Sequence, residues 1–99
     1  MLLNHTFEEL EETAVLEEVE TGKTARLIVH NDEVNTFDWV IKCFQEVLQH
    51  TSEQAEQLSI IIHSKGKATV KTATWRELKP KKDALVERGL SASIEEEEF

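Results

Sequence analysis

The sequence predicts an α+β fold in which three strands form one sheet and three helices pack on one of its faces. Three observations support this prediction. Segments alternate apolar and polar residues, other segments repeat apolar residues at helical spacing, and most segments begin or end with a capping or turn residue. The predicted order is strand, helix, helix, strand, helix, strand. At 99 residues the chain has the size of one small domain.

The first predicted elements are a strand and an amphipathic helix. Residues 25–31, ARLIVHN, are rich in β-formers and place Leu27 and Val29 on one face of a strand. Asn35 is a good helix N-cap. The apolar residues after it recur at helical spacing up to about residue 50, and they are Phe37, Val40, Ile41, Phe44 and Leu48.

A second helix and a second strand come next. Thr51 with Gln54 three residues later predicts a capping box, and Gly66 is suited to end the helix. Residues 67–73, KATVKTA, alternate in polarity as a strand does. The two helices therefore form a hairpin between the first two strands.

The last predicted elements are a helix and a strand. Thr74 with Glu77 predicts a helix start, and Gly89 a helix end. Pro80 lacks a backbone donor, so we expect either a kink or a short turn followed by a helix that begins at Pro80. Apolar residues then alternate with serines in a third strand, at Leu90, Ala92 and Ile94.

Acidic residues are concentrated at the two ends of the chain. The formal net charge is −9, but residues 1–24 hold seven Glu and one Lys and residues 95–98 hold four Glu, which leaves nine acids against ten bases in residues 25–94. This distribution argues against nucleic-acid binding, which needs a basic face. We predict a flexible acidic extension over residues 1–24, a folded core over 25–95 and an acidic tail over 96–99.

Composition also narrows the class of protein. The single cysteine, Cys43, excludes an internal disulfide and fits a reducing compartment, so we expect a cytoplasmic location. We also expect the protein to be a monomer. No apolar run approaches the roughly 18 residues of a spanning helix, so no membrane association is expected. No Cys-x-x-Cys, His-x-x-x-His or nucleophile-elbow pattern occurs. We therefore expect a protein that is not an enzyme and that needs no metal and no cofactor.

Polar side chains gather where the first strand ends. Asn31, Asp32 and Glu33 follow the strand, and His63 stands near the end of the second predicted helix. Carboxylate, amide and neutral imidazole groups all accept hydrogen bonds, so together they complement a cation with several donors, such as a primary ammonium. Spacing alone also fits a simple turn beside a helix N-cap, with His63 placed near the helix dipole.

Two blocks of sequence carry specific motifs, NDEVNTFDWV at residues 31–40 and EQAEQLSIIIHSKGKA at residues 53–68. Their order and separation resemble the ClpS adaptors of the ATP-dependent Clp protease, which recognise proteins by their N-terminal residue. In that family an ND(D/E) motif precedes a TF.WV-like helix start, and an alanine, an apolar run and H-x-x-G-K come later. The likeness covers about residues 26–95 and implies a ClpS-like fold with an antiparallel sheet.

The resemblance implies a role for the polar cluster. Matched by position, Asn31, Glu33 and His63 would bind the free α-amino group of a substrate protein, and Asp32 would belong to the same amine site by supporting its turn. An α-amino group with a pKa of about 7.7–8.0 is largely charged at neutral pH. An acetylated N-terminus lacks this charge and should not bind.

The resemblance also implies an apolar pocket for a large first residue, Leu, Phe, Tyr or Trp. Carried over position by position, the pocket wall would be Val29, His30, Asn35, Phe37, Val40, Ser59 and Leu90. From periodicity alone, several of these are plain core residues. This chain has Glu33, Phe37 and Ser59 where the family commonly has Asp, Met and Met, and these departures affect the ranking among large first residues.

Partners follow from the same resemblance. A Clp AAA+ unfoldase would dock through the N-terminal domain of its hexamer at the start of the third helix, where Lys79 and Lys81 match the contacting positions. Lys79 reverses the charge of the family's acidic residue. Residues 1–24 would enter the unfoldase pore during delivery. Composition fits a solubility tail equally well, and the lysines fit a solvated helix start.

Two other interpretations stay open from the sequence. The departures at Glu33, Phe37 and Ser59 are compatible with a ClpS-like module that docks on an unfoldase without reading N-terminal residues. A general interaction module of the same fold, similar to the C-terminal domain of the ribosomal stalk protein, lacks the polar cluster paired with a distant histidine. The presence of that cluster favours an adaptor that binds free N-termini.

Overall fold

The computed structural model of the protein describes residues 24–96, and its elements follow the predicted order. They are β1 (Ala25–His30), α2 (Phe37–Leu48), α3 (Ser52–Lys65), β2 (Lys67–Ala73), α4 (Trp75–Glu87) and β3 (Ser91–Glu96). The strand order is β2-β1-β3, and both pairings are antiparallel. The predicted α+β fold with a three-stranded antiparallel sheet is confirmed.

The predicted acidic extension and tail lie almost wholly outside the described residues. Only Thr24 of the extension and Glu96 of the tail are described. Glu96 is not part of a tail, because it is the last residue of β3 and pairs with Ala25. The third strand also begins after Leu90, at Ser91, so it is shifted toward the C-terminus relative to the prediction.

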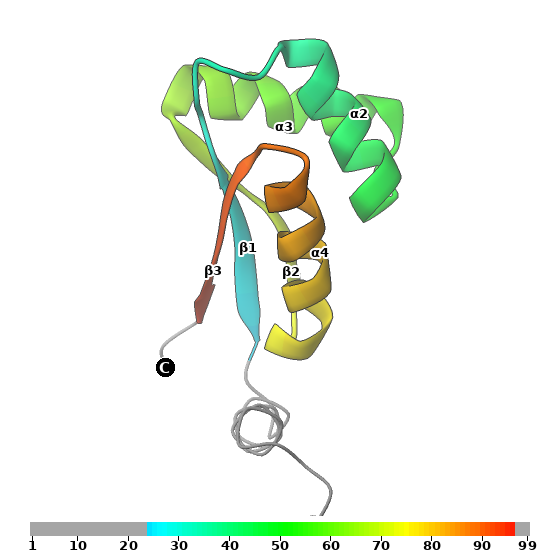
Figure 1. Cartoon of the computed structure of the whole chain (residues 1–99), viewed down its shortest axis with the longest axis vertical. Coiled ribbons are helices and arrows are strands. Elements are labelled where there is room, and N and C mark those ends of the chain that lie inside the picture. Colours follow the sequence, from blue (N-terminus) through cyan, green and yellow to red (C-terminus); the bar gives the residue numbers. More distant parts are fainter. Residues whose placement is uncertain (1–23, 97–99) are drawn as a thin grey trace, which may run out of the picture.

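The helices pack against one face and one end of the sheet. Figure 1 shows α4 lying along the strands, with α2 and α3 at the end where β1 leaves the sheet. The core between these layers includes Leu27 of β1, Phe44 of α2 and Leu85 of α4, all 0% exposed. Burying such side chains contributes about 1.5–3 kcal/mol each. The apolar faces predicted from periodicity therefore form one shared core.

Two helix starts agree with the predicted caps. The Thr51 hydroxyl accepts from the Gln54 backbone N–H, and the Gln54 side chain accepts from the Thr51 backbone N–H, which completes the capping box of α3. The Thr74 hydroxyl accepts from the Glu77 backbone N–H at the start of α4. Each cap satisfies donors that a helix start otherwise leaves unpaired.

The start of α2 differs from the prediction by one residue. The N-cap is Thr36, whose hydroxyl accepts from the Trp39 backbone N–H at 3.1 Å. The prediction that Asn35 caps this helix was wrong. The Asn35 side chain instead donates to the Asp32 carboxylate in the same loop and to the distant Gly89 carbonyl.

Helix α4 continues through Pro80. The helix spans Trp75–Glu87, so the alternative of a turn followed by a helix that begins at Pro80 was wrong. A proline removes one hydrogen bond from a helix interior, but buried Leu78 and Leu85 on either side hold this helix against the sheet. The chain then turns at Gly89, whose φ of +93° is the left-handed conformation that glycine adopts readily.

Candidate functional site

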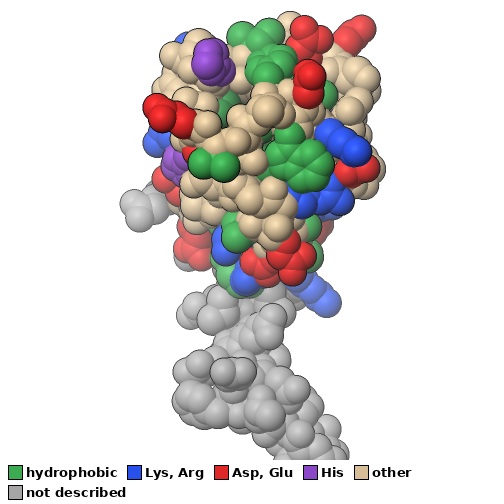
Figure 2. All heavy atoms as spheres, turned by 45° about the horizontal axis from the view of Figure 1, so that its top comes forward, with side chains coloured by type: hydrophobic (Ala, Val, Ile, Leu, Met, Phe, Trp, Pro, Cys, Tyr) green, Lys and Arg blue, Asp and Glu red, His purple; other side chains and the backbone are tan. Residues whose placement is uncertain are grey.

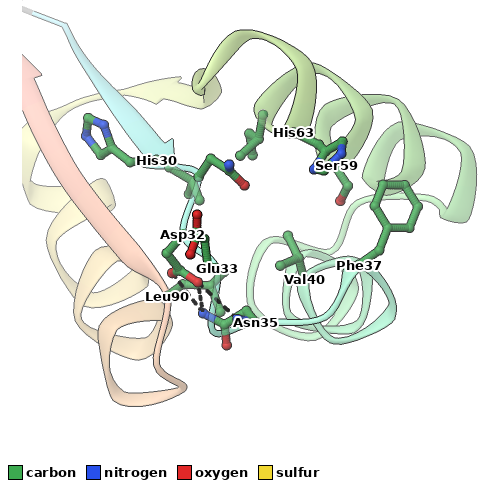
Figure 3. A pocket seen from close by; sticks show the side chains of 12 residues that line it. His30, Asp32, Glu33, Asn35, Phe37, Val40, Ser59, His63 and Leu90 are labelled. Carbon is green, nitrogen blue, oxygen red and sulfur yellow. Dashed lines mark hydrogen bonds between the residues drawn. The ribbon is translucent and has the colours of Figure 1, made fainter.

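A cavity of about 450 Å³ lies where the end of β1 meets α2 and α3 (Figure 3). Twelve residues line it, and eleven of them are the residues predicted for the amine site or the apolar pocket, the twelfth being Ile62. The eleven are Val29, His30, Asn31, Asp32, Glu33, Asn35, Phe37, Val40, Ser59, His63 and Leu90. The fold therefore brings all of them to one place, while their roles in binding stay predictions.

The cavity has a buried apolar floor and an exposed polar rim. The apolar floor consists of Val29, Ile62 and Leu90, which are 1%, 5% and 4% exposed. The acceptor rim consists of Asn31, Glu33 and His63, all of which are exposed. A ligand that carries a polar, donor-rich group next to an apolar side chain matches this division.

The acceptor rim is held by the junction between β1 and α3. Gly66 ends α3 with a φ of +95°, and its carbonyl accepts from the Asn31 backbone N–H at 2.8 Å. This bond ties the end of β1 to the helix end that carries His63. Within residues 24–96, the side chains of Asn31, Glu33 and His63 make no hydrogen bond or ion pair. Their acceptor atoms are therefore available to a ligand.

Asp32 is engaged inside the loop instead. Its Oδ1 accepts from the backbone N–H groups of Val34 and Asn35, both at 3.0 Å. Both carboxylate oxygens also accept from Asn35 Nδ2, at 3.0 and 2.9 Å. The Asn35 backbone N–H is the main cause that lowers the pKa of Asp32, because it stabilises the ionised carboxylate. Asp32 therefore supports the turn that presents its neighbours.

Asn35 joins this loop to the far end of α4. Its Nδ2 also donates to the Gly89 carbonyl at 2.9 Å. The nearby Trp39 Nε1 donates to the Arg88 carbonyl at 3.0 Å, which is a second tie between the same two segments. These contacts bring Leu90 to the cavity, although it lies 50 residues or more along the chain from the loop.

Two predicted pocket residues lie at the edge of the cavity in different ways. The His30 ring points away from the cavity in Figure 3, and its Nε2 lies 3.0 Å from Ser93 Oγ. His30 therefore contributes to the wall without its ring. Phe37, the first residue of α2, lines the cavity but is 42% exposed.

Ile62 is the lining residue that sequence reasoning missed. It falls within the second predicted helix and was not among the predicted site residues, yet it lines the cavity together with Ser59 and His63. The signal was available, because Ser59, Ile62 and His63 follow at spacings of three and four and so share one helix face.

Comparison with known proteins identifies the family to which this fold belongs. A protein-family model described as ATP-dependent Clp protease adaptor protein ClpS matches residues 20–93. The chain belongs to the ClpS family. Proteins named ATP-dependent Clp protease adapter protein ClpS, from Streptomyces avermitilis and Streptomyces coelicolor, are 32% and 31% identical over 93 residues. These matches cover 90% of this chain and 89% and 97% of the two relatives.

A solved structure shares the ClpS fold with this chain. The structure of Agrobacterium tumefaciens ClpS2 bound to L-phenylalaninamide superimposes with a TM-score of 0.70 at 20% sequence identity. The match covers 76% of this chain and 98% of ClpS2. The predicted ClpS-like fold is confirmed, and family membership makes this protein an adaptor of the Clp protease.

The two lysines that were predicted to contact the Clp unfoldase lie on α4, outside the cavity. Lys79 Nζ donates to both carboxylate oxygens of Asp83, at 2.8 and 2.7 Å. In the described part of the chain, Lys81 makes no ion pair and is partly exposed. Lys81 is therefore the more available of the two cations.

The remaining surface around the ClpS cavity is mixed in character. Figure 2 turns the α2 and α3 end toward the viewer and shows apolar, acidic and basic side chains interspersed. Among residues 24–96, no group of three or more His, Cys, Asp or Glu side chains is placed to hold a metal ion. None of the helices in that range combines the length and apolar character needed to span a membrane.

Proposed function

We propose that this ClpS adaptor binds the free α-amino group and the large hydrophobic first residue (Leu, Phe, Tyr or Trp) of substrate proteins. It then delivers them to a Clp AAA+ unfoldase for degradation. The observation that carries the proposal is the acceptor rim of Asn31, Glu33 and His63, which stands beside the apolar floor of the same cavity. A protein N-terminus with a large first side chain carries both matching groups within a few ångströms.

The solved ClpS2 structure supports this assignment through its ligand. L-phenylalaninamide has a free α-amino group next to a phenylalanine side chain, and it is bound to a protein of this fold. In the present chain the rim supplies acceptors for an ammonium, and Val29, Ile62 and Leu90 supply apolar surface for a side chain. The ammonium of such a ligand therefore matches the acceptor rim, and its side chain matches the apolar floor.

The expected affinity is moderate. Hydrogen bonds to a charged group contribute about 1.5–3 kcal/mol each, and burying a large apolar side chain contributes about the same. Association itself costs at least about 4 kcal/mol in lost freedom. The balance predicts dissociation constants near the micromolar range rather than the picomolar range. Such binding allows release, which a delivery protein requires.

Peptide titration tests the N-terminal amine directly. Fluorescent peptides that differ only in residue one and in acetylation should separate into two groups, because only a free ammonium can donate to the rim. Peptides with a free Leu or Phe start should bind, and acetylated peptides or those that start with Asp should not. Equal affinity for free and acetylated peptides would remove this proposal and favour a module that docks without reading N-termini.

Substitutions in the acceptor rim test whether His63 and Glu33 bind the amine. His63→Ala should weaken binding of a free Leu peptide markedly. Glu33→Gln removes one charge and should weaken it by about 10- to 100-fold, the equivalent of one charge-assisted contact. Glu53→Gln is the matched control, since Glu53 is an exposed acid on α3 outside this cavity. Equal losses in the two glutamine variants would contradict a specific role for Glu33.

Delivery is the second half of the proposal. We assign docking to Lys79 and Lys81 on α4 and handover to residues 1–24, and we place the protein in the cytoplasm with its unfoldase. Because Lys79 is already paired with Asp83, Lys81→Glu is the sharper variant. It should reduce degradation of a Leu-start reporter by the Clp machinery and leave peptide affinity unchanged. Unchanged degradation would contradict docking at this position.

A further inference from the structure

One polar side chain interrupts the buried floor of the cavity. Ser59 is 3% exposed, and it is the only polar residue that is buried among residues 24–96. It lines the cavity together with Val29, Ile62 and Leu90, which are all apolar. A buried hydroxyl is unfavourable unless its hydrogen-bonding groups are satisfied, so its bonding pattern determines what the cavity can accept.

The Ser59 proton is already used inside the helix. Ser59 Oγ donates to the Ala55 carbonyl at 2.8 Å, one turn earlier in α3. A hydroxyl has one donor and two acceptor lone pairs, so the oxygen still has the capacity to accept. No group within residues 24–96 donates to it. Toward a ligand, Ser59 is therefore an acceptor and not a donor.

An aromatic ring lines the same cavity as this acceptor. Figure 3 shows the Ser59 side chain pointing from α3 into the cavity, which the Phe37 ring of α2 also lines. Phe37 is 42% exposed, so part of its ring surface is free for contact. A pair of aromatic rings in an edge-to-face or offset arrangement is stabilised beyond what the burial of its area contributes.

We propose that this cavity selects first residues whose aromatic side chain carries a hydrogen-bond donor, Trp and Tyr, over Phe and Leu. Ser59 Oγ accepts from the indole N–H or the phenol O–H, and the Phe37 ring contacts the aromatic face or edge. This inference rests on the proposed function, because it assumes that the first side chain of a substrate enters the cavity.

The expected preference is modest and measurable. A neutral hydrogen bond in such a site changes affinity by about 2- to 10-fold. A Phe or Leu side chain would exclude water from the Ser59 oxygen without donating a hydrogen bond to it. This unsatisfied acceptor further lowers the affinity for Phe and Leu relative to Trp and Tyr. The contact with Phe37 adds an advantage of similar size for aromatic over aliphatic first residues.

The decisive pair of peptides differs in a single donor. One begins with Trp and the other with 3-benzothienylalanine, in which sulfur replaces the indole N–H in a ring of nearly the same shape. Wild-type protein should bind the Trp peptide about 2- to 10-fold more tightly. Ser59→Ala should abolish this difference, and Ser59→Thr, which keeps a hydroxyl, should retain it. Thermal melting of each variant establishes that it is folded.

Ser64→Ala is the matched control for Ser59→Ala. Ser64 lies on the same helix and donates to the Ile60 carbonyl at 2.8 Å in the same manner, but it is exposed and does not line the cavity. This variant should keep the full preference for Trp. In addition, Phe37→Leu should reduce the advantage of aromatic over Leu peptides by about 2- to 10-fold.

The outcomes separate the two proposals. If acetylated and free Trp peptides bind equally, the N-terminal function fails, and this inference fails with it. If binding requires the free amine but wild-type protein does not distinguish Trp from 3-benzothienylalanine, only the selection by Ser59 is overturned. The same conclusion follows if Ser59→Ala keeps the preference.

Discussion

Replacing Asp32 with alanine should destabilise the folded protein and weaken the amine site together. The Asp32 carboxylate accepts from the backbone N–H groups of Val34 and Asn35 and from the Asn35 side chain. Without it, two backbone donors lose their partner, and Asn35 loses the group that orients it toward the Gly89 carbonyl. The loop that presents the acceptor rim then has no fixed shape.

The size of the effect follows from these bonds. Each backbone hydrogen bond contributes a net of about 0.5–1.5 kcal/mol, so the two predict a loss of about 1–3 kcal/mol in the free energy of unfolding. For a domain of this size, about 1 kcal/mol corresponds to a drop of about 4–8 °C in Tm. Asp32→Asn keeps an acceptor oxygen for the backbone donors, so it should lose less.

The pH dependence of the effect has a definite sign. Hydrogen bonding lowers the pKa of Asp32 in the folded protein below its ordinary value of 3.8. The stabilisation is therefore present above pH 3.8, and it is lost as the pH falls through the lower folded pKa. The stability difference between wild type and Asp32→Ala should accordingly narrow in strong acid.

Denaturant unfolding followed by circular dichroism measures this difference at several pH values. Asp38→Ala is the matched control, because Asp38 is an exposed aspartate in the first turn of α2, outside the cavity. It should change the free energy of unfolding by less than about 1 kcal/mol, the usual limit for an exposed charge near a helix end. The reasoning is refuted if the two alanine variants are equally stable, or if the loss at Asp32 is unchanged at pH 2.

Three further predictions concern stability. His50 has a buried Nδ1 without a partner in the described residues, and burial lowers its pKa below 6.5. Its protonation therefore opposes folding, so wild type should lose stability as the pH falls below 6.5, and His50→Leu should lose less when Tm is followed against pH. Gly66→Ala places a side chain at a φ of +95° and should cost about 1–2 kcal/mol by denaturant unfolding, although no atom crowds the new methyl group. Pro80→Ala restores a backbone donor inside α4 and should raise Tm.

Each of these three predictions can fail. Parallel Tm profiles for wild type and His50→Leu would show that this imidazole does not oppose folding in acid. An unchanged unfolding free energy in Gly66→Ala would contradict the conformational argument, since contacts offer no other reason for a loss. A lower Tm in Pro80→Ala would mean that the proline's restriction of the unfolded chain outweighs the missing hydrogen bond.

Local signals in the sequence were sufficient for the order and type of the elements. The hydroxyls of Thr51 and Thr74 cap their helices as the spacing predicted, because a cap depends only on residues three positions apart. Pro80 was misjudged for the opposite reason. Local chemistry argues against a proline inside a helix, but the buried neighbours Leu78 and Leu85 hold the helix together across it.

In the candidate site, too, the sequence indicated what depends on local residues and missed what depends on distant contacts. The rim residues Asn31, Glu33 and His63 were visible in the sequence as candidate acceptors for an ammonium, and the family resemblance added their role in binding an α-amino group. The assignment of Asn35 as an N-cap failed, because its side chain donates to the Gly89 carbonyl, which is distant in sequence. The outward direction of the His30 ring likewise follows from the alternation of β1 and from its contact with Ser93 in β3.

The sequence by itself determined the order and type of the helices and strands, the nearly neutral core between acidic ends, and the residue types available to bind an ammonium. These depend on composition and on neighbours within about one helical turn. Only the tertiary structure decided that Asp32 supports the loop while the rim side chains stay unpaired, and that the Ser59 oxygen faces a cavity instead of a packed core. Those properties depend on which distant segments meet, and a hydrogen-bonding group is free or engaged only once its neighbours in space are fixed.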